Sequence, residues 1–363
     1  MGRQLVRTLA TVALLAARAL AGANLTAAKG LEHGLVVDGL TRPRGMVEDS
    51  GGNLLVVERG KGILRLVLDK GEGTDVRVAS RTMAVNESKL NHGIALSTDG
   101  KTLFASSSSD VWAWSYDASR GTTSNRRHVM TGMKQGGHET RTLLVPRKGD
   151  GNLLLVSRGS DGNVDKSTVD IQSAKSQIRV FRIDELLGGG EEAVGYDSGE
   201  VLGWGLRNSV GVGEDPTTGN IWSVENSLDN MHRHNRDIHQ TNPGDELNFH
   251  GRPSDHHSRV YGRNFGYPAC VAIFDASVVE GYPGGAKTGM QMTGDHMRGM
   301  NFTDEYCQSH TVAPVITLDA HLAPLDIDFL DDGSAAFISM HGSWNRKPGV
   351  GYRVTPFRHI GDP

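Results

Sequence analysis

Arginine, histidine and asparagine residues recur in this sequence just before short apolar stretches that have the pattern of β-strands. Arg207 and Asn208, for example, precede the stretch "SVGVGEDPTTGNIWSV". Similar polar residues stand at Arg42, Arg44, Asn91, His92, His138, Arg141 and His321. Arginine binds carboxylates through two parallel hydrogen bonds, and histidine can move protons near neutral pH. If they meet in space, these residues favour a carboxylated ligand and a proton transfer.

The polar residues belong to a repeated unit. Each unit has a polar start, a short apolar strand, a tight turn with glycine and a second apolar strand. The units begin at Arg42, Leu90, Thr140, Leu206 and Leu322. Their turn glycines are Gly52, Gly100, Gly151, Gly219 and Gly333. Glycine suits these positions because tight hairpin turns need a positive φ.

The repeat predicts the architecture. Most hairpins are followed by further strands, such as "VWAWSY" and "QIRVFRI", and four strands per unit around an axis make a β-propeller. The interval between Gly219 and Gly333 is roughly double the others, which leaves room for one more blade disguised by an insertion. We therefore expect an all-β fold, a six-bladed β-propeller of four-stranded antiparallel blades, over residues 30–363. A β-sandwich or two small β domains is the alternative.

The hairpin topology predicts where the polar residues meet. The first two strands of each unit run antiparallel, so the start of the first and the end of the second lie on the same face. The ends of the second strands add Glu58, Arg59 and the segments 158–165, 225–235 and 341–346. One face of the propeller should therefore collect the polar residues, whereas the opposite face should carry solvated turns.

Composition excludes some partners. The chain has 47 glycines and only 6% aromatic residues, which favours short strands joined by tight turns. Its net charge is −4 and no basic stripe with interleaved aromatic residues occurs, so we expect no nucleic-acid partner. No segment is long and apolar enough to cross a bilayer, so we expect no membrane partner.

The N-terminus and the cysteines indicate a secreted protein. Residues 1–23 combine basic residues, an apolar run and a small-residue exit, which predicts a signal peptide; an amphipathic helix is the alternative. Asn24, Asn86 and Asn301 begin glycosylation sequons, which suit an extracellular glycoprotein. The only two cysteines, Cys270 and Cys307, predict one disulfide that pins a long insertion, with two buried thiols as the alternative.

Six short motifs carry a resemblance to a known family. They are "NHGIALS", "GGHETRTL", "GLRNSVG", "GDELNFHG", "GRNFGYP" and "HGSWNR". Together, and in this order, they resemble the glucose/sorbosone dehydrogenase family of soluble quinoproteins, and most closely the fungal secreted pyranose dehydrogenases that use pyrroloquinoline quinone (PQQ). The resemblance spans roughly residues 34–357. It implies a secreted enzyme that oxidises a sugar hydroxyl by proton abstraction and hydride transfer to a calcium-bound quinone.

The resemblance also implies the catalytic residues. His138 is similar to the base that takes the hydroxyl proton, and Arg207 and Asn208 resemble the pair beside the reactive carbonyl of the quinone, where Arg207 polarises and Asn208 orients. Asp161 and Asp165 are candidates for the carboxylate that orients the base. No lysine of this chain is matched to the one that the bacterial enzymes place near the cofactor.

The same resemblance implies cofactor and metal ligands. The cofactor-binding candidates are Arg44, His92, Arg207, Asn208, His341, Trp344 and Arg346. Trp344 is also a candidate sugar-stacking platform. Residues Glu225, Asn226 and Ser227 are similar to a loop that holds Ca²⁺, although the bacterial enzymes commonly have Gln-Gly-Pro there. Calcium prefers oxygen ligands, which a glutamate and backbone carbonyls supply.

Two further functions stay open at this point. A calcium-dependent lactone hydrolase would need carboxylates from several blades, and a non-catalytic carbohydrate- or protein-binding propeller would share the fold alone. As a dehydrogenase, the protein would require a sugar substrate and an external electron acceptor, for which a cytochrome is one candidate.

Overall fold

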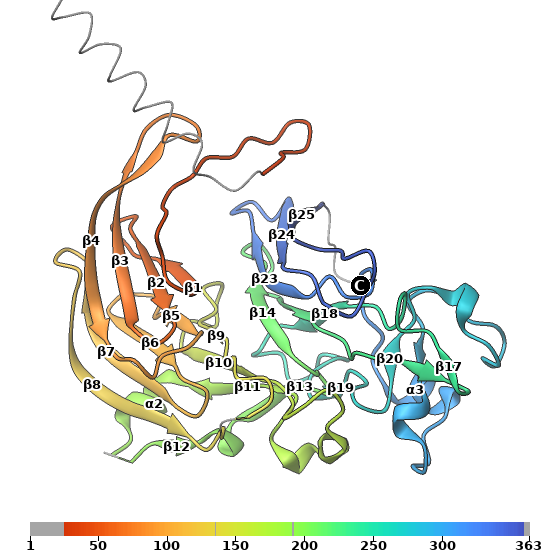
Figure 1. Cartoon of the computed structure of the whole chain (residues 1–363). Helices are drawn as coiled ribbons and strands as arrows, with labels where there is room; N and C mark the ends of the chain where they lie inside the picture. The colour runs from red at the N-terminus through yellow and green to blue at the C-terminus, as the bar shows by residue number, and fades with distance from the viewer. Residues whose placement is uncertain (1–24, 135, 191, 359–363) are drawn as a thin grey trace, which may run out of the picture.

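The computed structural model describes residues 25–134, 136–190 and 192–358. In these residues the chain forms five main sheets, largely antiparallel, which follow one another in a curved arrangement (Figure 1). Their first strands line a shared cavity. The fold is a β-propeller, and each sheet is one blade. Within each blade, the first strand lies innermost, next to the cavity.

The first three blades have the following strands. The first contains β1 (Pro43–Glu48), β2 (Leu54–Glu58), β3 (Gly62–Lys70) and β4 (Val76–Asn86). The second contains β5 (Ile94–Leu96), β6 (Thr102–Ser106), β7 (Val111–Asp117) and β8 (Thr122–Thr131), with β12 (Val194–Gly195) parallel to β8. The third contains β9 (Leu143–Leu144), β10 (Leu153–Arg158), β11 (Gln177–Arg182) and β13 (Glu200–Trp204), with β19 (Arg263–Asn264) parallel to β13.

The last two blades complete the array. The fourth contains β14 (Ser209–Glu214), β15 (Ile221–Glu225), β18 (Glu246–Gly251) and β22 (Ile316–Thr317). The fifth contains β23 (Pro324–Phe329), β24 (Ala335–Met340) and β25 (Arg353–Arg358). A short helix, α2 (Ile183–Gly188), follows β11.

The innermost strands of all five blades line a cavity of about 910 Å³. Its lining is mixed: Ile94 and Ile327 are apolar, whereas Arg44 and His92 bring polar groups into it. Of the predicted polar residues, Arg44 and His92 from the starts of the first two blades line this central space.

The hairpin turns are formed largely as predicted. Gly52, Gly100, Gly219 and Gly333 have φ between 67° and 77°, where a side chain would be strained. In the third blade the prediction was wrong, because the positive φ falls on Gly149, with φ 94°, and not on Gly151. The longer loop between β9 and β10 moves the bend two residues earlier.

The core lies between neighbouring blades. One cluster of buried apolar side chains joins the first and second blades, and includes Leu55, Ile63 and Trp112. Comparable clusters join the second blade to the third, the third to the fourth and the fourth to the fifth. Each blade is therefore stabilised mainly by the apolar surface that it buries against its neighbours.

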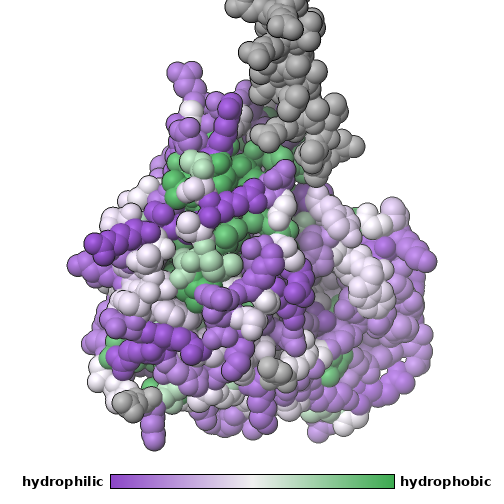
Figure 2. Space-filling view, turned by 60° about the vertical axis from the view of Figure 1, so that its left-hand side comes forward, coloured by the Kyte–Doolittle hydropathy of each residue, from purple (hydrophilic) through white to green (hydrophobic). Residues whose placement is uncertain are grey.

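The first and fifth blades each have a face that packs against no other sheet in the described part of the chain. In the first blade, Met46 pairs with Val56 on the next strand, and Leu64 pairs with Met83, so these side chains share one face. Met46 is 63% exposed. The surface view shows an apolar area within a largely hydrophilic surface (Figure 2). The five described blades thus form an open array.

The prediction of six blades was wrong: the described residues form five. The long interval after Gly219 contains no additional four-stranded sheet. Parts of it join existing blades, because β18 and β22 complete the fourth blade and β19 pairs with the third. The rest includes two pairs of two-residue strands and one α-helix. These elements are β16 (His232–Arg233), β17 (Arg236–Asp237), β20 (Val271–Ala272), β21 (Gln291–Met292) and α3 (Asp304–His310). We call residues 226–245 and 252–315, which flank β18, the insertion.

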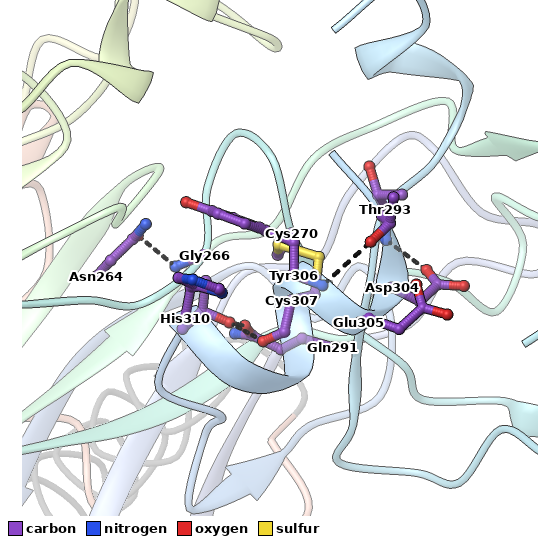
Figure 3. Close-up of a disulfide and its surroundings, with 12 residues drawn as sticks. Asn264, Gly266, Cys270, Gln291, Thr293, Asp304, Glu305, Tyr306, Cys307 and His310 are labelled. Atoms are coloured by element: carbon purple, nitrogen blue, oxygen red, sulfur yellow. Dashed lines mark hydrogen bonds between the residues drawn. A yellow bond between two sulfur atoms is a disulfide. The ribbon is translucent and has the colours of Figure 1, made fainter. Parts of the chain in front are cut away.

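The insertion has its own small core and a disulfide. Cys270 and Cys307 are bonded, which confirms the predicted bridge, and link the segment before β20 to α3 (Figure 3). Buried Arg233 forms an ion pair with Asp304 at the start of α3, at 2.6 Å between Nη2 and Oδ2. Asp304 also accepts the backbone N–H of Thr293, at 3.0 Å. The insertion is therefore an ordered unit attached to the fourth blade.

Three further predictions concern the signal peptide, the glycosylation sequons and membrane crossing. The predicted signal peptide and the sequon residue Asn24 lie outside the described residues. Asn86 and Asn301 are exposed in the structure. Among the described residues, no helix is both long enough and apolar enough to cross a membrane.

Candidate functional site

The third and fourth blades bring His138, Arg207 and Asn208 together. His138 precedes β9, and Arg207 and Asn208 directly precede β14. Between them lies Gly159, where an added Cβ would come within 2.8 Å of the Cβ of His138 and 3.0 Å of the carbonyl oxygen of Arg207. Only glycine allows so close an approach. The structure thus gathers the three residues that the sequence proposed as catalytic.

His138 is held in a defined orientation by Ser160. Its Nδ1 lies 3.0 Å from the backbone oxygen of Ser160 and 3.0 Å from Ser160 Oγ. A carbonyl oxygen can only accept, so Nδ1 carries the hydrogen of the neutral ring and Nε2 is left as the basic nitrogen. No described protein group hydrogen-bonds to Nε2. Burial, and then the positive charge of Arg207, lower the pKa of His138 to about 4. The imidazole is therefore neutral at physiological pH.

Arg207 is buried, with 6% of its surface exposed. Its Nε donates to the backbone oxygen of Asn163 at 3.1 Å, and Nη1 donates to that of Asn226 at 3.2 Å. Its Nη2 lies 3.0 Å from Asn163 Oδ1 and 3.4 Å from Asp229 Oδ2. The guanidinium is therefore fixed by loops of the third and fourth blades, and it places a permanent charge next to His138.

Asn208 joins the same network. Its backbone N–H donates to Glu225 Oε1, and its Oδ1 accepts from Thr140 Oγ1 at 3.5 Å. Only 8% of its surface is exposed. Asn208 therefore lies between the segment of His138 and the end of β15.

Residues 225–227 form the predicted calcium loop, and the first of them, Glu225, forms hydrogen bonds inside the fourth blade. Both side-chain oxygens of Glu225 are used inside the fourth blade, by the N–H of Asn208 and, at 2.6 Å, by the hydroxyl of Ser209. Burial raises the pKa of Glu225 to about 8. The Glu225 side chain thus forms hydrogen bonds inside the fourth blade, and the roles of Glu225, Asn226 and Ser227 as calcium ligands stay predictions.

Asn226 and Ser227 are half-buried at the edge of the site. Asn226 Nδ2 donates to the backbone oxygen of Pro324, and the N–H of Ser227 donates to Asp245 Oδ1 at 2.9 Å. Asp245 also accepts from the N–H of Ala323 at 2.8 Å. These contacts fasten the segment to the start of the fifth blade. Within the described residues, no group of three or more histidine, cysteine, aspartate or glutamate side chains has the arrangement of a metal site.

Arg44 and His92, both predicted to bind the cofactor, lie in the central cavity. Arg44 Nε donates to His92 Nδ1 at 3.3 Å. Burial, and then the charge of Arg44, lower the pKa of His92 to about 3, so His92 is a neutral acceptor for Arg44. The two residues lie at the starts of the first and second blades, and the structure pairs them with each other.

The other predicted cofactor residues lie at the end of the fifth blade. Arg346 Nη1 donates to Asp319 and, at 3.2 Å, to the backbone oxygen of Ala320. His341 is exposed, and the Trp344 side chain is 74% exposed. Asn345, which directly follows Trp344, is buried, and its Nδ2 has no hydrogen-bond partner in the described structure. This segment thus contains one arginine, an exposed imidazole, an exposed indole ring and an amide donor without a hydrogen-bond partner.

His321 connects the group of His138 and Arg207 with the residues of the fifth blade. His321 Nε2 lies 2.6 Å from the backbone oxygen of His239, and its Nδ1 lies 3.8 Å from Asp229 Oδ1. Asp229 also pairs with Arg207. Burial lowers the pKa of His321. A polar chain therefore runs from His138 through Arg207 and Asp229 to the fifth blade.

Sequence reasoning missed the loop contacts that organise this site. Asp161 and Asp165, the proposed orienting carboxylates, both bind Lys175 Nζ, at 3.0 and 2.6 Å. The direct partner of His138 is Ser160. Asn163 and Asp229 come from irregular loops without periodic pattern, and the signal for each was only its place in the polar segments 158–165 and 225–235.

Comparisons with known proteins identify the family. A family described as TrAA12-like matches residues 25–362. A pyrroloquinoline quinone-dependent sugar dehydrogenase of Hypocrea jecorina is 42% identical over 321 residues, which cover 87% of this chain and 73% of the relative. A pyrroloquinoline quinone-dependent pyranose dehydrogenase of Coprinopsis cinerea is 40% identical over 336 residues, but this chain spans only 44% of its length.

A solved structure agrees with this assignment. The calcium structure of a Trichoderma reesei carbohydrate-active enzyme of family AA12 has a TM-score of 0.87 and 41% identity, and the match covers 92% of this chain and 81% of that chain. The sequence identity and the shared fold extend over the elements that carry His138, Arg207 and Asn208. The chain therefore belongs to the TrAA12-like family.

Proposed function

We propose that this protein is a secreted, PQQ-dependent oxidoreductase that oxidises a hydroxyl group of a pyranose-type sugar. The observation that carries the proposal is the state of His138. Its Nδ1 is held by Ser160, its Nε2 is free of described protein partners, and its ring is neutral beside the charged Arg207. Two PQQ-dependent sugar dehydrogenases are at least 40% identical to this chain, which supports the assignment.

The residues present fit an anionic quinone. PQQ carries three carboxylates, and the polar face offers arginines on several blades, the exposed His341 and the unpartnered Nδ2 of Asn345. Arg346 and Arg207 would hold it electrostatically, and Asn345 would add a neutral donor. The fit to Ca²⁺ is narrower, because it depends on the oxygens of Glu225, Asn226 and Ser227 and not on a cluster of carboxylates. A related structure that contains calcium supports including the ion in the proposal.

The chain's own groups would divide the chemistry as follows. His138 Nε2 takes the proton of the sugar hydroxyl as the C–H bond breaks. Arg207 provides a fixed positive charge, which stabilises negative charge that develops nearby. Asn208 and Trp344 orient the bound molecules. When bound, PQQ supplies the two-electron acceptor for the hydride. An external electron acceptor then completes the cycle.

The decisive experiment is a titration of the secreted, purified protein with PQQ, with and without a calcium chelator, followed by the absorbance of the quinone. We expect saturable binding that is lost in chelator and restored by calcium. Oxidation of a panel of pyranoses with an artificial electron acceptor should then require both PQQ and calcium. A protein that binds no quinone under either condition would overturn the proposal, and a lactone hydrolase or a non-catalytic propeller should behave in that way.

A further inference from the structure

We infer that Asn163 is a positioning residue for Arg207, and that its loop, residues 160–165, sets the geometry between the base and the cation. The inference rests on the proposed function, because the catalytic role of Arg207 belongs to it. The hydrogen bonds of Asn163 on which the inference rests are formed without any cofactor.

Asn163 makes two of the four contacts that fix the guanidinium of Arg207. Its backbone oxygen accepts from Nε at 3.1 Å, and its Oδ1 accepts from Nη2 at 3.0 Å. The two acceptors belong to one residue, so they define the plane of the guanidinium as well as its place. The remaining contacts, to Asn226 and Asp229, are longer, at 3.2 and 3.4 Å.

Asn163 also fastens the neighbouring loop of the fourth blade. Its Oδ1 accepts from the N–H of Asp229 at 2.8 Å, and its Nδ2 donates to the backbone oxygen of Asp229 at 2.9 Å. This two-way bridge needs one acceptor and one donor on a short side chain. Asparagine provides both, whereas aspartate lacks the donor and alanine lacks both.

The loop that carries Asn163 is itself held from two sides. Lys175 binds Asp161 and Asp165 at the two ends of the loop. Tyr267 Oη, from the insertion, accepts from the N–H of Asp165 at 2.7 Å and lies 3.1 Å from the backbone oxygen of Asn163. The same loop presents Ser160 to His138. One fixed segment thus places the base and the cation relative to each other.

Without the Asn163 side chain, Asp229 becomes the principal partner of Nη2, and the guanidinium is free to turn away from His138. The charge of Arg207 helps to lower the pKa of His138; Arg141 also lowers it, and Asp161 raises it. The pKa of His138 therefore reports on the place of Arg207 in the protein without cofactor.

The test is an NMR titration of His138 in the cofactor-free protein, with selectively labelled histidine and assignment by His138→Gln. We expect Asn163→Ala to raise the pKa of His138 by about one unit, the size of an ordinary effect of a nearby charge. In an Arg207→Ala background, Asn163→Ala should add no further shift. An unchanged pKa in the first comparison, or an equal shift in both backgrounds, would overturn the inference. If Asn163→Ala does not fold, Asn163→Ser takes its place with the same expectation.

Kinetics provide a second readout once PQQ binding has been established. Asn163→Ala should lower kcat at least tenfold and change KM for the sugar little, and Asn163→Asp, which keeps the acceptor for Arg207, should recover part of the loss. Asn53→Ala is the matched control, because it removes a buried asparagine side chain in a turn of the first blade. It should leave both constants unchanged. Equal losses in both alanine variants would indicate a general effect on stability. If the protein binds no PQQ, the NMR result still decides the role of Asn163.

Discussion

At the scale of single residues, the environment of His138 sets the pH range of its function. A general base must be neutral, and burial together with Arg207 lowers the pKa of His138 to about 4. We therefore expect kcat/KM to fall as the pH drops through about 4, and not near 6.5 where a solvated histidine titrates. The measurement is the pH dependence of kcat/KM with saturating PQQ. An acid limb near 6.5 would mean that another group is the base.

Arg207 offers a second test at the same scale. Lysine keeps the charge but cannot reproduce contacts to Asn163, Asn226 and Asp229 at once. Arg207→Lys should therefore still bind PQQ, while turnover per bound quinone falls by about 10² to 10³, the usual cost of losing one transition-state donor. If turnover stays near wild type and only the melting temperature falls, Arg207 serves to connect the blades.

At the scale of elements, sequence analysis predicted the hairpins well because each has its own local signal, an apolar strand on either side of a glycine. It also predicted that His138 and Arg207 would meet, because both precede innermost strands. The interval after Gly219 could not be resolved in this way, since spacing alone does not distinguish a blade from an insertion. The hydrogen bonds of Glu225 inside the fourth blade could not be predicted for a similar reason. The pairing of Glu225 with Ser209 across β14 and β15 turns the carboxyl inward, and only the register reveals this.

The insertion yields a prediction of its own. The Cys270–Cys307 bridge closes a loop with a sequence separation of 37 residues, and removing such a bridge typically costs about 2–4 kcal/mol. Cys270→Ser/Cys307→Ser should therefore unfold at lower denaturant concentration than the wild type. Alkylation of the native, non-reduced protein should detect no free thiol. Two alkylated cysteines, or an unchanged unfolding midpoint, would contradict the bridge.

At the scale of the whole molecule, the site depends on contacts between blades more than on any single blade. His138, Arg207 and Asp229 are held across the third and fourth blades, and His321 extends the polar chain to the fifth. These blades are joined by continuous apolar clusters. The geometry of the site is therefore as stable as the packing of these central sheets.

The open array has a dynamic consequence. In a linear array of repeats, an internal unit is stabilised by two interfaces and a terminal unit by only one, so the ends fray first. Amide hydrogens of β3 and β24 should therefore exchange with deuterium faster than those of β10 and β15 in this chain. Hydrogen exchange followed by mass spectrometry would measure the difference, and uniform protection across all five blades would show that the ends are covered. Fraying at both ends would leave His138 and Arg207, in the third and fourth blades, in the most slowly opening part of the molecule.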